Sequence, residues 1–249
     1  MLAVLRDPCF SLNAVEKDKA VMMAVVKRLT AAGHAVEVVS ETDISSCRPA
    51  AYDLILSMGR HAETLRLLQS SGCRVINSSE GVSRCRRSQL QQTMKEAGVP
   101  MPPEQGPQGY WLKRGDAAGA LTKEDVVFAA DEKALQRRIA EFRQRGIDDY
   151  VVSAHVTGDE IKFYGVRGTG FFRCYDPNGD GESFQVAAIQ QAAERLAAAV
   201  GIDVYGGDCI IRQDGTFCMI DFNDWPSFSR CREEAADAIV SYITEHEEI

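Results

Sequence analysis

The sequence predicts a parallel α/β unit at the start of the chain, followed by an α+β region built on antiparallel sheets. In residues 1–80, short apolar strands alternate with helical patterns, an order that builds a parallel sheet covered by helices. Beyond residue 110, alternating strands are joined by tight turns, at Thr157-Gly158-Asp159 and at Gln213-Asp214-Gly215, as in antiparallel hairpins. The expected fold class is therefore α/β and α+β within one chain.

The parallel unit begins with an apolar strand at residues 2–5. A helix is expected from about Asn13, which can cap it, to Ala32, and Gly33 ends it. The remaining elements of this unit are strands at 35–39, 54–57 and 74–76 and a helix near 62–70.

Two loops follow strands of this predicted sheet, Arg6-Asp7-Pro8 and Met58-Gly59-Arg60-His61. Ligands of parallel sheets bind beyond the carboxyl ends of the strands, so these loops are candidates for one wall of a pocket. The alternative is that Arg60 and His61 belong to a solvated loop and the start of a helix.

A dense run of Pro and Gly provides the best domain boundary. A helix is expected from about Gly81 to Ala97, and residues 98–109 then contain four prolines and three glycines. Beyond this linker we expect, in order, strands at 110–113 and 126–129, a helix at 132–145, strands at 150–152, 161–166 and 170–175, a helix at 184–200, a hairpin of 208–211 with 217–221, and a helix at 232–244. The predicted division is 1–80, 81–109, 110–166 and 167–249.

Composition excludes several classes of protein. The 249 residues include 36 Asp+Glu against 28 Lys+Arg, a net charge of −8 that would repel a nucleic acid. No apolar run approaches the roughly 20 residues that cross a bilayer, so no membrane partner is expected. The charges at Arg6 and Asp7 come too early for a secretory signal, and the eight cysteines are scattered, without a C-x-x-C pair. We therefore expect a cytoplasmic protein whose thiols are reduced.

The stretch most informative about chemistry contains Asp208 and Asp221-Phe222-Asn223. The hairpin turn brings Asp208 and Asp221 near each other, and Asn223 shares a face of the extended chain with Asp221. Two carboxylates and a carboxamide form an oxygen-only site suited to Mg²⁺. The alternative is that Asp208 caps a turn and Asn223 merely ends a strand.

These residues resemble the ATP-grasp superfamily. The pattern Asp208 … Asp221-Phe222-Asn223-Asp224-Trp225-Pro226 is similar to the end of its metal-ligand set, and Asp rather than Glu before x-Asn resembles the inositol phosphate kinase branch. The resemblance implies an N-terminal pre-ATP-grasp α/β domain, then a two-lobed ATP-grasp domain with antiparallel sheets. Residues 110–166 would form the nucleotide lobe and 167–249 the metal and substrate lobe.

The same resemblance implies which residues bind ATP and Mg²⁺ or Mn²⁺. The phosphates would meet Arg87, where the family normally has Lys, as well as Lys113 and a loop from Gly115 to Gly119. Adenine would lie against a hinge strand, which here has Ala154 where many relatives have Glu, and ribose against Glu160, with Asp159 as a rival. The implied hinge residues are Val152, Ser153, Ala154 and His155, and the implied metal ligands are Asp208, Asp221 and Asn223.

The resemblance implies a ligase that activates a small-molecule carboxylate as an acylphosphate. Lys162 would stabilise the transferred charge, with a surface lysine as its alternative. Arg173 and Arg230 would clamp an anionic substrate, with a solvated or ion-paired arginine as the alternative for each. A small-molecule kinase acting on a hydroxyl is a second hypothesis, and a non-catalytic nucleotide-binding module a third. Whether the protein forms a homodimer is left open by the sequence.

Overall fold

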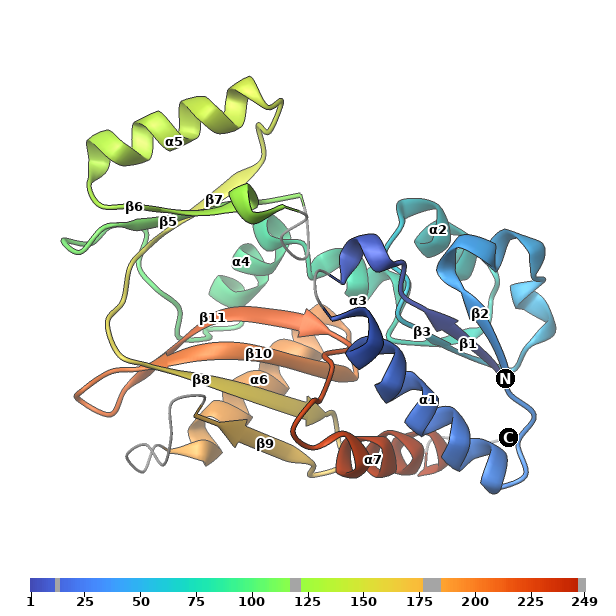
Figure 1. The fold of residues 1–249 in the computed structure, drawn as a ribbon. Coiled ribbons are helices and arrows are strands. Elements are labelled where there is room, and N and C mark those ends of the chain that lie inside the picture. The colour runs from blue at the N-terminus through green and yellow to red at the C-terminus, as the bar shows by residue number, and fades with distance from the viewer. Residues whose placement is uncertain (12–13, 117–121, 177–184, 246–249) are drawn as a thin grey trace.

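The computed structural model describes residues 1–11, 14–116, 122–176 and 185–245 (Figure 1). Its first sheet is parallel throughout, with strand order β2-β1-β3-β4. The strands and their two covering helices are β1 (Leu2–Leu5), β2 (Glu37–Ser40), β3 (Leu54–Ser57), β4 (Arg74–Ile76), α1 (Val15–Ala31) and α2 (Ala62–Ser70). The parallel sheet expected from the alternating pattern is confirmed.

Successive residues of β1 bury their side chains on opposite faces of this sheet. Ala3 packs into the core that contains α1, whereas Leu2 and Val4 pack with Leu68 of α2. Both faces are therefore covered, which is why these strands read as continuous apolar runs.

The second and third sheets are antiparallel. The order β6-β5-β7 is formed by β5 (Tyr110–Arg114), β6 (Val126–Ala129) and β7 (Tyr150–Ala154), and α5 (Glu132–Gln144) lies over it (Figure 1). The order β11-β10-β8-β9 is formed by β8 (Asp159–Val166), β9 (Phe172–Tyr175), β10 (Val204–Ile211) and β11 (Phe217–Asp224), and α6 (Val186–Val200) packs against it.

The last helix shares a core with the first sheet. Figure 1 shows α7 (Arg232–Glu245) beside α1, and apolar side chains of both helices pack in one cluster with Trp225 and Phe228. The α1 members of this cluster include Val21, Val25 and Leu29, and the α7 members include Ala235, Ile239 and Ile243.

A buried asparagine ties the end of the first sheet to β10. The side chain of Asn77, which is 1% exposed, donates to the carbonyl of Val204 at 2.7 Å and accepts from the N–H groups of Asp203 and Val204, each at 2.8 Å. All hydrogen-bonding capacity except one amide N–H is used, so the parallel sheet has a fixed position relative to β10.

Three expectations about elements need correction. The helix expected from Gly81 to Ala97 is two helices, α3 (Ser79–Arg84) and α4 (Arg87–Glu96), because Arg86 adopts an extended backbone with ψ of 135°. β10 begins at Val204, ahead of Asp208. The division at residue 166 does not follow the sheets, since β8 pairs with β9 and β10, and the change of sheet comes between β7 and β8.

Some expected features lie outside the described residues. They are the cap at Asn13 and most of the loop that ends at Gly119. All eight cysteines are described, and none is in a disulfide. Within the described ranges, no helix combines the length and apolar character needed to cross a membrane.

Candidate functional site

The two aspartates of the predicted metal set face each other across β10 and β11. Asp208 pairs with Asp221 in the register, and a bulge follows Asp208. Burial and the nearby carboxylate of Asp221 raise the pKa of Asp208, although Lys162 opposes this with a hydrogen bond of 2.6 Å from Nζ to Oδ1. Asn223 lies two residues beyond Asp221 on the same strand, and its carboxamide has no hydrogen bond to a described residue. The structure thus brings the three predicted ligands to one end of the hairpin.

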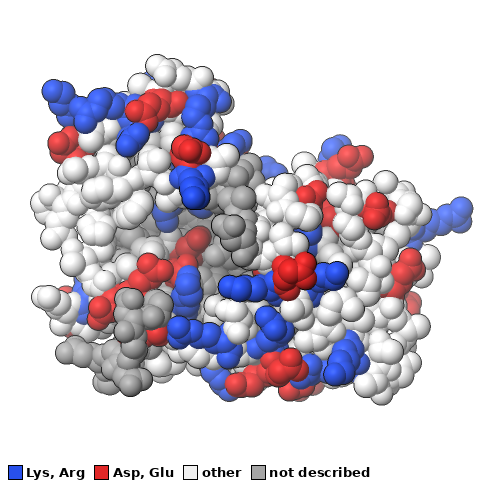
Figure 2. All heavy atoms as spheres, viewed as in Figure 1, with Lys and Arg blue, Asp and Glu red and all other residues white. Residues whose placement is uncertain are grey.

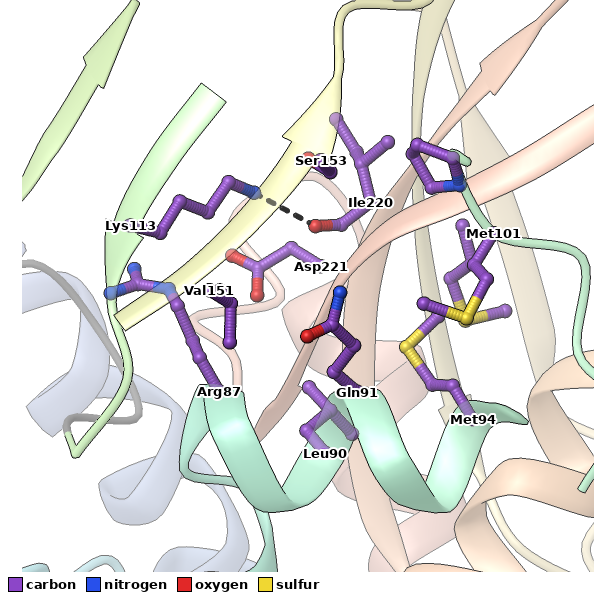
Figure 3. A pocket seen from close by; sticks show the side chains of 12 residues that line it. Arg87, Leu90, Gln91, Met94, Met101, Lys113, Val151, Ser153, Ile220 and Asp221 are labelled. Carbon is purple, nitrogen blue, oxygen red and sulfur yellow. Dashed lines mark hydrogen bonds between the residues drawn. The ribbon is translucent and has the colours of Figure 1, made fainter. Parts of the chain in front are cut away.

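Two cations approach Asp221 from other elements. Lys113 of β5 donates from Nζ to the carbonyl of Ile220 at 3.0 Å, and Figure 3 shows its chain reaching over Asp221. Arg87, the first residue of α4, is 8% exposed and donates from Nη1 to the carbonyl of Arg114 at 3.2 Å. Burial lowers the pKa of both side chains, while the charge of Asp221 acts in the opposite direction.

Arg87 has one group without a partner. Its Nε atom is buried and forms no hydrogen bond within the described part of the chain. Leaving a buried charged donor unpaired is costly, so this side chain is poised for an acceptor that the polypeptide itself does not supply.

A cavity of about 260 Å³ lies between the two antiparallel sheets, and a smaller one of about 50 Å³ adjoins it. The smaller space is the one drawn in Figure 3, where Met94 and Met101 close one end. The two cavities share Pro102, Lys113, Ser153 and Ile220 as lining residues, so they lie side by side in the cleft between the sheets. The larger cavity is also lined by Trp111, Val126, Ala154, His155, Val156, Glu160 and Ile210.

Trp111 at this cleft and Phe128 beside it were missed by sequence reasoning, whereas the neighbouring His155 was expected as a hinge residue. Trp111 donates from its indole nitrogen to Nδ1 of His155 at 3.2 Å, and Phe128 packs against both rings at centroid distances of 5.4 and 5.6 Å. The register of β5 with its two neighbours brings the rings together, since Trp111 pairs with Phe128 on one side and Ser153 on the other. The only sequence signal for this cluster was the strand-like pattern of Tyr110-Trp111-Leu112-Lys113, in which alternate side chains lie on the same face.

The two predicted substrate arginines have partners within the protein. Arg173 pairs with Glu234 and lies over the ring of Phe171. Arg230 lies over the ring of Tyr175 and donates to the carbonyl of Asp176 at 3.3 Å. Their role in substrate binding stays a prediction.

Close packing explains why residue 115 is a glycine. Its N–H donates to the carbonyl of Asp149 at 2.8 Å, and a Cβ at this position would collide with the side chains of Ser88 and Asp149. Contact between Gly115 and a phosphate therefore stays a prediction, and Gly119 lies outside the described residues.

The loops after β1 and β3 meet beside the metal set. Arg6 and Arg60 both donate to the carboxylate of Asp224, at 3.2 and 2.6 Å, and Arg6 also pairs with Asp18 at 3.0 Å. Burial alone would raise the pKa of Asp224, but the charges of Arg60 and Arg6 outweigh it and hold the pKa below its ordinary value. The parallel sheet thus directly supports the backbone immediately after Asn223.

Charges of both signs line the hollow face of the molecule. Figure 2 shows Lys and Arg side chains close to Asp and Glu side chains along the depression beneath the lobe that carries α5. This is the arrangement expected where an anion and a cation bind together, although the whole chain has a net charge of −8.

Solved structures share this fold along the entire chain. D-alanyl-alanine synthetase A from Vibrio cholerae aligns with a TM-score of 0.73 at 11% identity, covering 98% of each chain. A RimK domain ATP-grasp protein from Sphaerobacter thermophilus aligns at 0.68 with 18% identity, covering 98% of this chain and 99% of the other, and a D-cycloserine synthetase aligns at 0.68 with 15% identity, covering 97% and 99%.

Sequence comparison alone gives no match: no family model and no curated protein matches the chain. At identities this low, the structural likeness concerns the fold. The chain has a parallel sheet, a three-stranded and a four-stranded antiparallel sheet, and a cavity between the latter two, and it aligns over 98% of its length with the first two of those proteins. The chain therefore has the ATP-grasp fold.

Proposed function

We propose that this protein is an Mg-ATP-dependent ligase that activates a small-molecule carboxylate and joins it to an amine or thiol. The observation that carries the proposal is the meeting of Lys113 and the incompletely paired Arg87 with Asp221 at the edge of a cleft between two antiparallel sheets. ATP-grasp proteins of similar fold include D-alanyl-alanine and D-cycloserine synthetases, whose names describe ligation.

The larger cavity would hold the base and ribose of ATP. Its volume of about 260 Å³ is somewhat below the roughly 300–1,000 Å³ of pockets that enclose whole ligands, so the phosphates would extend toward Lys113. The N–H groups of Ala154 and His155 already donate to the carbonyls of Pro103 and Gly109, at 2.7 and 2.8 Å. The N–H of Val156, for which the described residues provide no acceptor, would be available to adenine, and Glu160 would be the carboxylate for the ribose hydroxyls.

The predicted ligands fit a magnesium ion chemically. Asp208, Asp221 and Asn223 offer oxygen atoms only, and the uncommitted carboxamide of Asn223 matches the preference of Mg²⁺ for carboxylate and amide oxygens completed by phosphates and water. Mn²⁺ accepts the same donors. The bound ion would neutralise phosphate charge during transfer. Lys162 now neutralises Asp208, and metal binding would leave that lysine free to approach a phosphate.

The chemistry then needs positioning rather than a side-chain nucleophile. A substrate carboxylate oxygen attacks the γ-phosphorus of ATP and ADP leaves. An amine or thiol then attacks the acyl carbon, losing its proton to solvent or a base, and inorganic phosphate leaves. Arg87, Lys113 and Lys162 would stabilise the charge that moves between these groups. We assign the protein to the cytoplasm, with a small molecule as its substrate.

A kinase acting on a hydroxyl is the second candidate. The observation that favours it is Asp221 before x-Asn223, the variant similar to the inositol phosphate kinase branch. The same nucleotide site would then transfer the γ-phosphoryl group to an alcohol, and the phosphorylated product would be stable.

The two candidates differ in product. ADP release would be measured with Mg-ATP against a panel of amino acids, short peptides and hydroxylated metabolites, with hydroxylamine added as a trap. A ligase requires an acid and gives a hydroxamate with hydroxylamine, whereas a kinase gives a stable phosphate ester.

Two variants connect the measurement to the site. Asp221→Asn should abolish turnover, while Asp43→Asn, at an exposed position of the first unit, should leave it unchanged. Full activity in Asp221→Asn, or an equal loss in both variants, would contradict the assignment of the site.

A further inference from the structure

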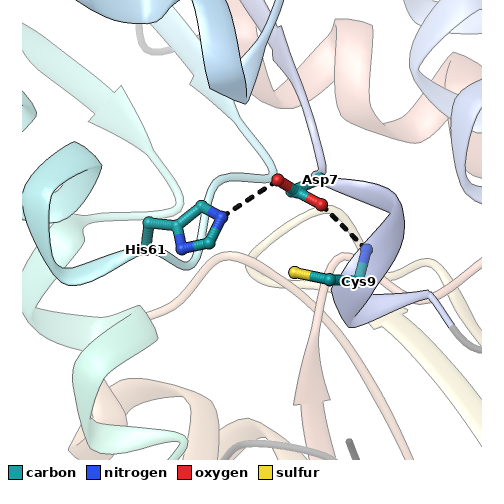
Figure 4. A group of neighbouring side chains, drawn as sticks. All are labelled: Asp7, Cys9 and His61. Atoms are coloured by element: carbon teal, nitrogen blue, oxygen red, sulfur yellow. Dashed lines mark hydrogen bonds and ion pairs between the residues drawn. The ribbon is translucent and has the colours of Figure 1, made fainter.

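Three side chains of different chemistry converge at the carboxyl edge of the parallel sheet. Asp7 and Cys9 follow β1, His61 follows β3, and one ligand atom of each lies within 4.8 Å of the other two (Figure 4). Nε2 of His61 is 3.0 Å from Oδ2 of Asp7. No other His, Cys, Asp and Glu group of this kind occurs among the described residues.

The backbone around this trio is fixed by a buried carboxylate. Glu41 is 2% exposed, and it accepts hydrogen bonds from the N–H groups of Asp7 at 3.1 Å, Arg60 at 2.5 Å and His61 at 2.7 Å. One side chain therefore holds both loops. The convergence of Asp7 with His61 does not depend on their own contact.

The side chains themselves are also oriented. Oδ1 of Asp7 accepts from the N–H of Cys9 at 2.8 Å, which leaves Oδ2 directed at His61. The ring of Phe10 packs edge-on against the imidazole at a centroid distance of 4.8 Å. Figure 4 shows the sulfur of Cys9 on the same side of Asp7 as the imidazole.

These separations are close to those of ligands on one metal ion. Two atoms at about 2.0–2.1 Å from a tetrahedral Zn²⁺ are about 3.3 Å apart, against the 3.0 Å between Asp7 and His61. Cys9 is exposed, so its side chain is free to move the remaining distance. A carboxylate, an imidazole and a thiolate together favour Zn²⁺ and similar transition metals over Mg²⁺, which binds oxygen ligands.

The charges behind the trio also favour a cation. The charged side chains next to the two loops are Arg6 and Arg60, with two positive charges, and Asp18, Asp224 and Glu41, with three negative ones, so carboxylates are in excess. Asp7 adds a further negative charge. Because the arginines are paired with Asp18 and Asp224, their charges are compensated by these carboxylates.

We propose that Asp7, Cys9 and His61 bind one Zn²⁺ or a similar late first-row transition-metal ion, with a fourth position open to water or to a ligand. This site would be separate from the Asp208, Asp221 and Asn223 set, and it would join the two loops whose preceding residues, Arg6 and Arg60, hold Asp224. The proposal does not rest on the proposed ligase activity.

Cobalt(II) provides a direct test, because a thiolate ligand gives Co²⁺ an intense near-ultraviolet charge-transfer band that oxygen ligands do not give. The full-length protein would be titrated with Co²⁺ in the presence of millimolar Mg²⁺. We expect the band to saturate at one equivalent and to disappear when Zn²⁺ is added. A titration without a thiolate band would overturn the proposal.

Variants identify the ligands. Cys9→Ser should remove the band, and His61→Ala should weaken Co²⁺ binding at least tenfold, whereas Cys47→Ser, at a second partly accessible cysteine, should leave both unchanged. Retention of the band in Cys9→Ser would refute the assignment. Asp221→Asn should keep the band, which separates this site from the proposed magnesium site.

A second measurement does not depend on cobalt. Zn²⁺ should slow alkylation of Cys9 by iodoacetamide at least tenfold, as read by peptide mass spectrometry, and should leave alkylation of Cys47 unaffected. An unchanged rate at Cys9 would count against the site. Thermal unfolding of the metal-free variants verifies that they fold, since Cys9 and His61 lie at the surface.

Discussion

Arg60 donates a 2.6 Å hydrogen bond to Asp224, a carboxylate that is fully buried and lies directly after Asn223. Arg60 is itself only 9% exposed, so both charges of the pair are removed from water. Removing one partner of a buried pair leaves the other charge uncompensated, which commonly costs 3–5 kcal/mol. Because Arg6 still pairs with Asp224, we expect Arg60→Met to lower the free energy of unfolding by about 3 kcal/mol in urea denaturation.

Arg173→Met is the matched control. Arg173 also pairs with a single carboxylate, that of Glu234, but both side chains are about half exposed, and exposed pairs contribute only about 0–1 kcal/mol. Equal losses in the two variants would show that the burial of Arg60 has no energetic consequence.

The stability conferred by Asp224 should depend on pH. Its pKa is lowered in the folded protein, so the unfolded chain, with an Asp pKa of about 3.9, takes up its proton first as the pH falls. The stabilisation is therefore complete above about pH 5 and is lost toward the folded pKa. We expect the difference in unfolding free energy between wild type and Asp224→Asn to shrink by about 1 kcal/mol between pH 5 and pH 3. A constant difference over that range would contradict the lowered pKa.

Arg87 should have opposite effects on binding and stability. Its buried Nε lacks a partner, so Arg87→Met removes an unsatisfied donor and should leave the ligand-free protein equally stable or more stable. The same variant should weaken ATP binding at least tenfold, and Arg87→Lys should restore part of it. Isothermal titration calorimetry and urea denaturation on the same samples measure the two effects. A parallel loss of both would indicate a purely structural role.

Glu160 should recognise the sugar of the nucleotide. It lines the larger cavity and its side chain is half exposed, so its carboxylate is available to a hydroxyl pair. The wild type should bind ATP roughly tenfold more tightly than 3′-deoxy-ATP, and Glu160→Gln should reduce that preference. Asp159→Asn is the control for the neighbouring carboxylate. If Asp159→Asn alone removes the preference, the two roles must be exchanged.

Local patterns predicted much of the fold. The 208–221 hairpin was predictable because Gln213-Asp214-Gly215 lies between alternating runs, and β10 and β11 do pair around it. The break between α3 and α4 was not, because Arg86 takes an extended backbone inside a stretch with uninterrupted helical composition.

The site was predictable only where its residues are close in sequence or carried by a known motif. Asp221 and Asn223 were found in this way. The pairs of Arg6 and Arg60 with Asp224 span 218 and 164 residues, and no spacing rule reports such contacts. The loops after β1 and β3 were expected to lie together because parallel strands end at one edge, and the contact of Asp7 with His61 agrees with that expectation. Whether they touch a substrate stays a prediction.

The shared core of α1 and α7 determines how this protein unfolds. The helices α1 and α7 cover the same face of the parallel sheet. If either the first unit or the remainder of the chain unfolded alone, apolar surface on the other would be exposed to water. Hydrogen exchange should accordingly report α1, β1 and α7 opening as a single cooperative unit. A fragment cut at the Pro/Gly-rich linker would keep every strand of its sheet and α1, but it would lose the part of the covering that α7 provides.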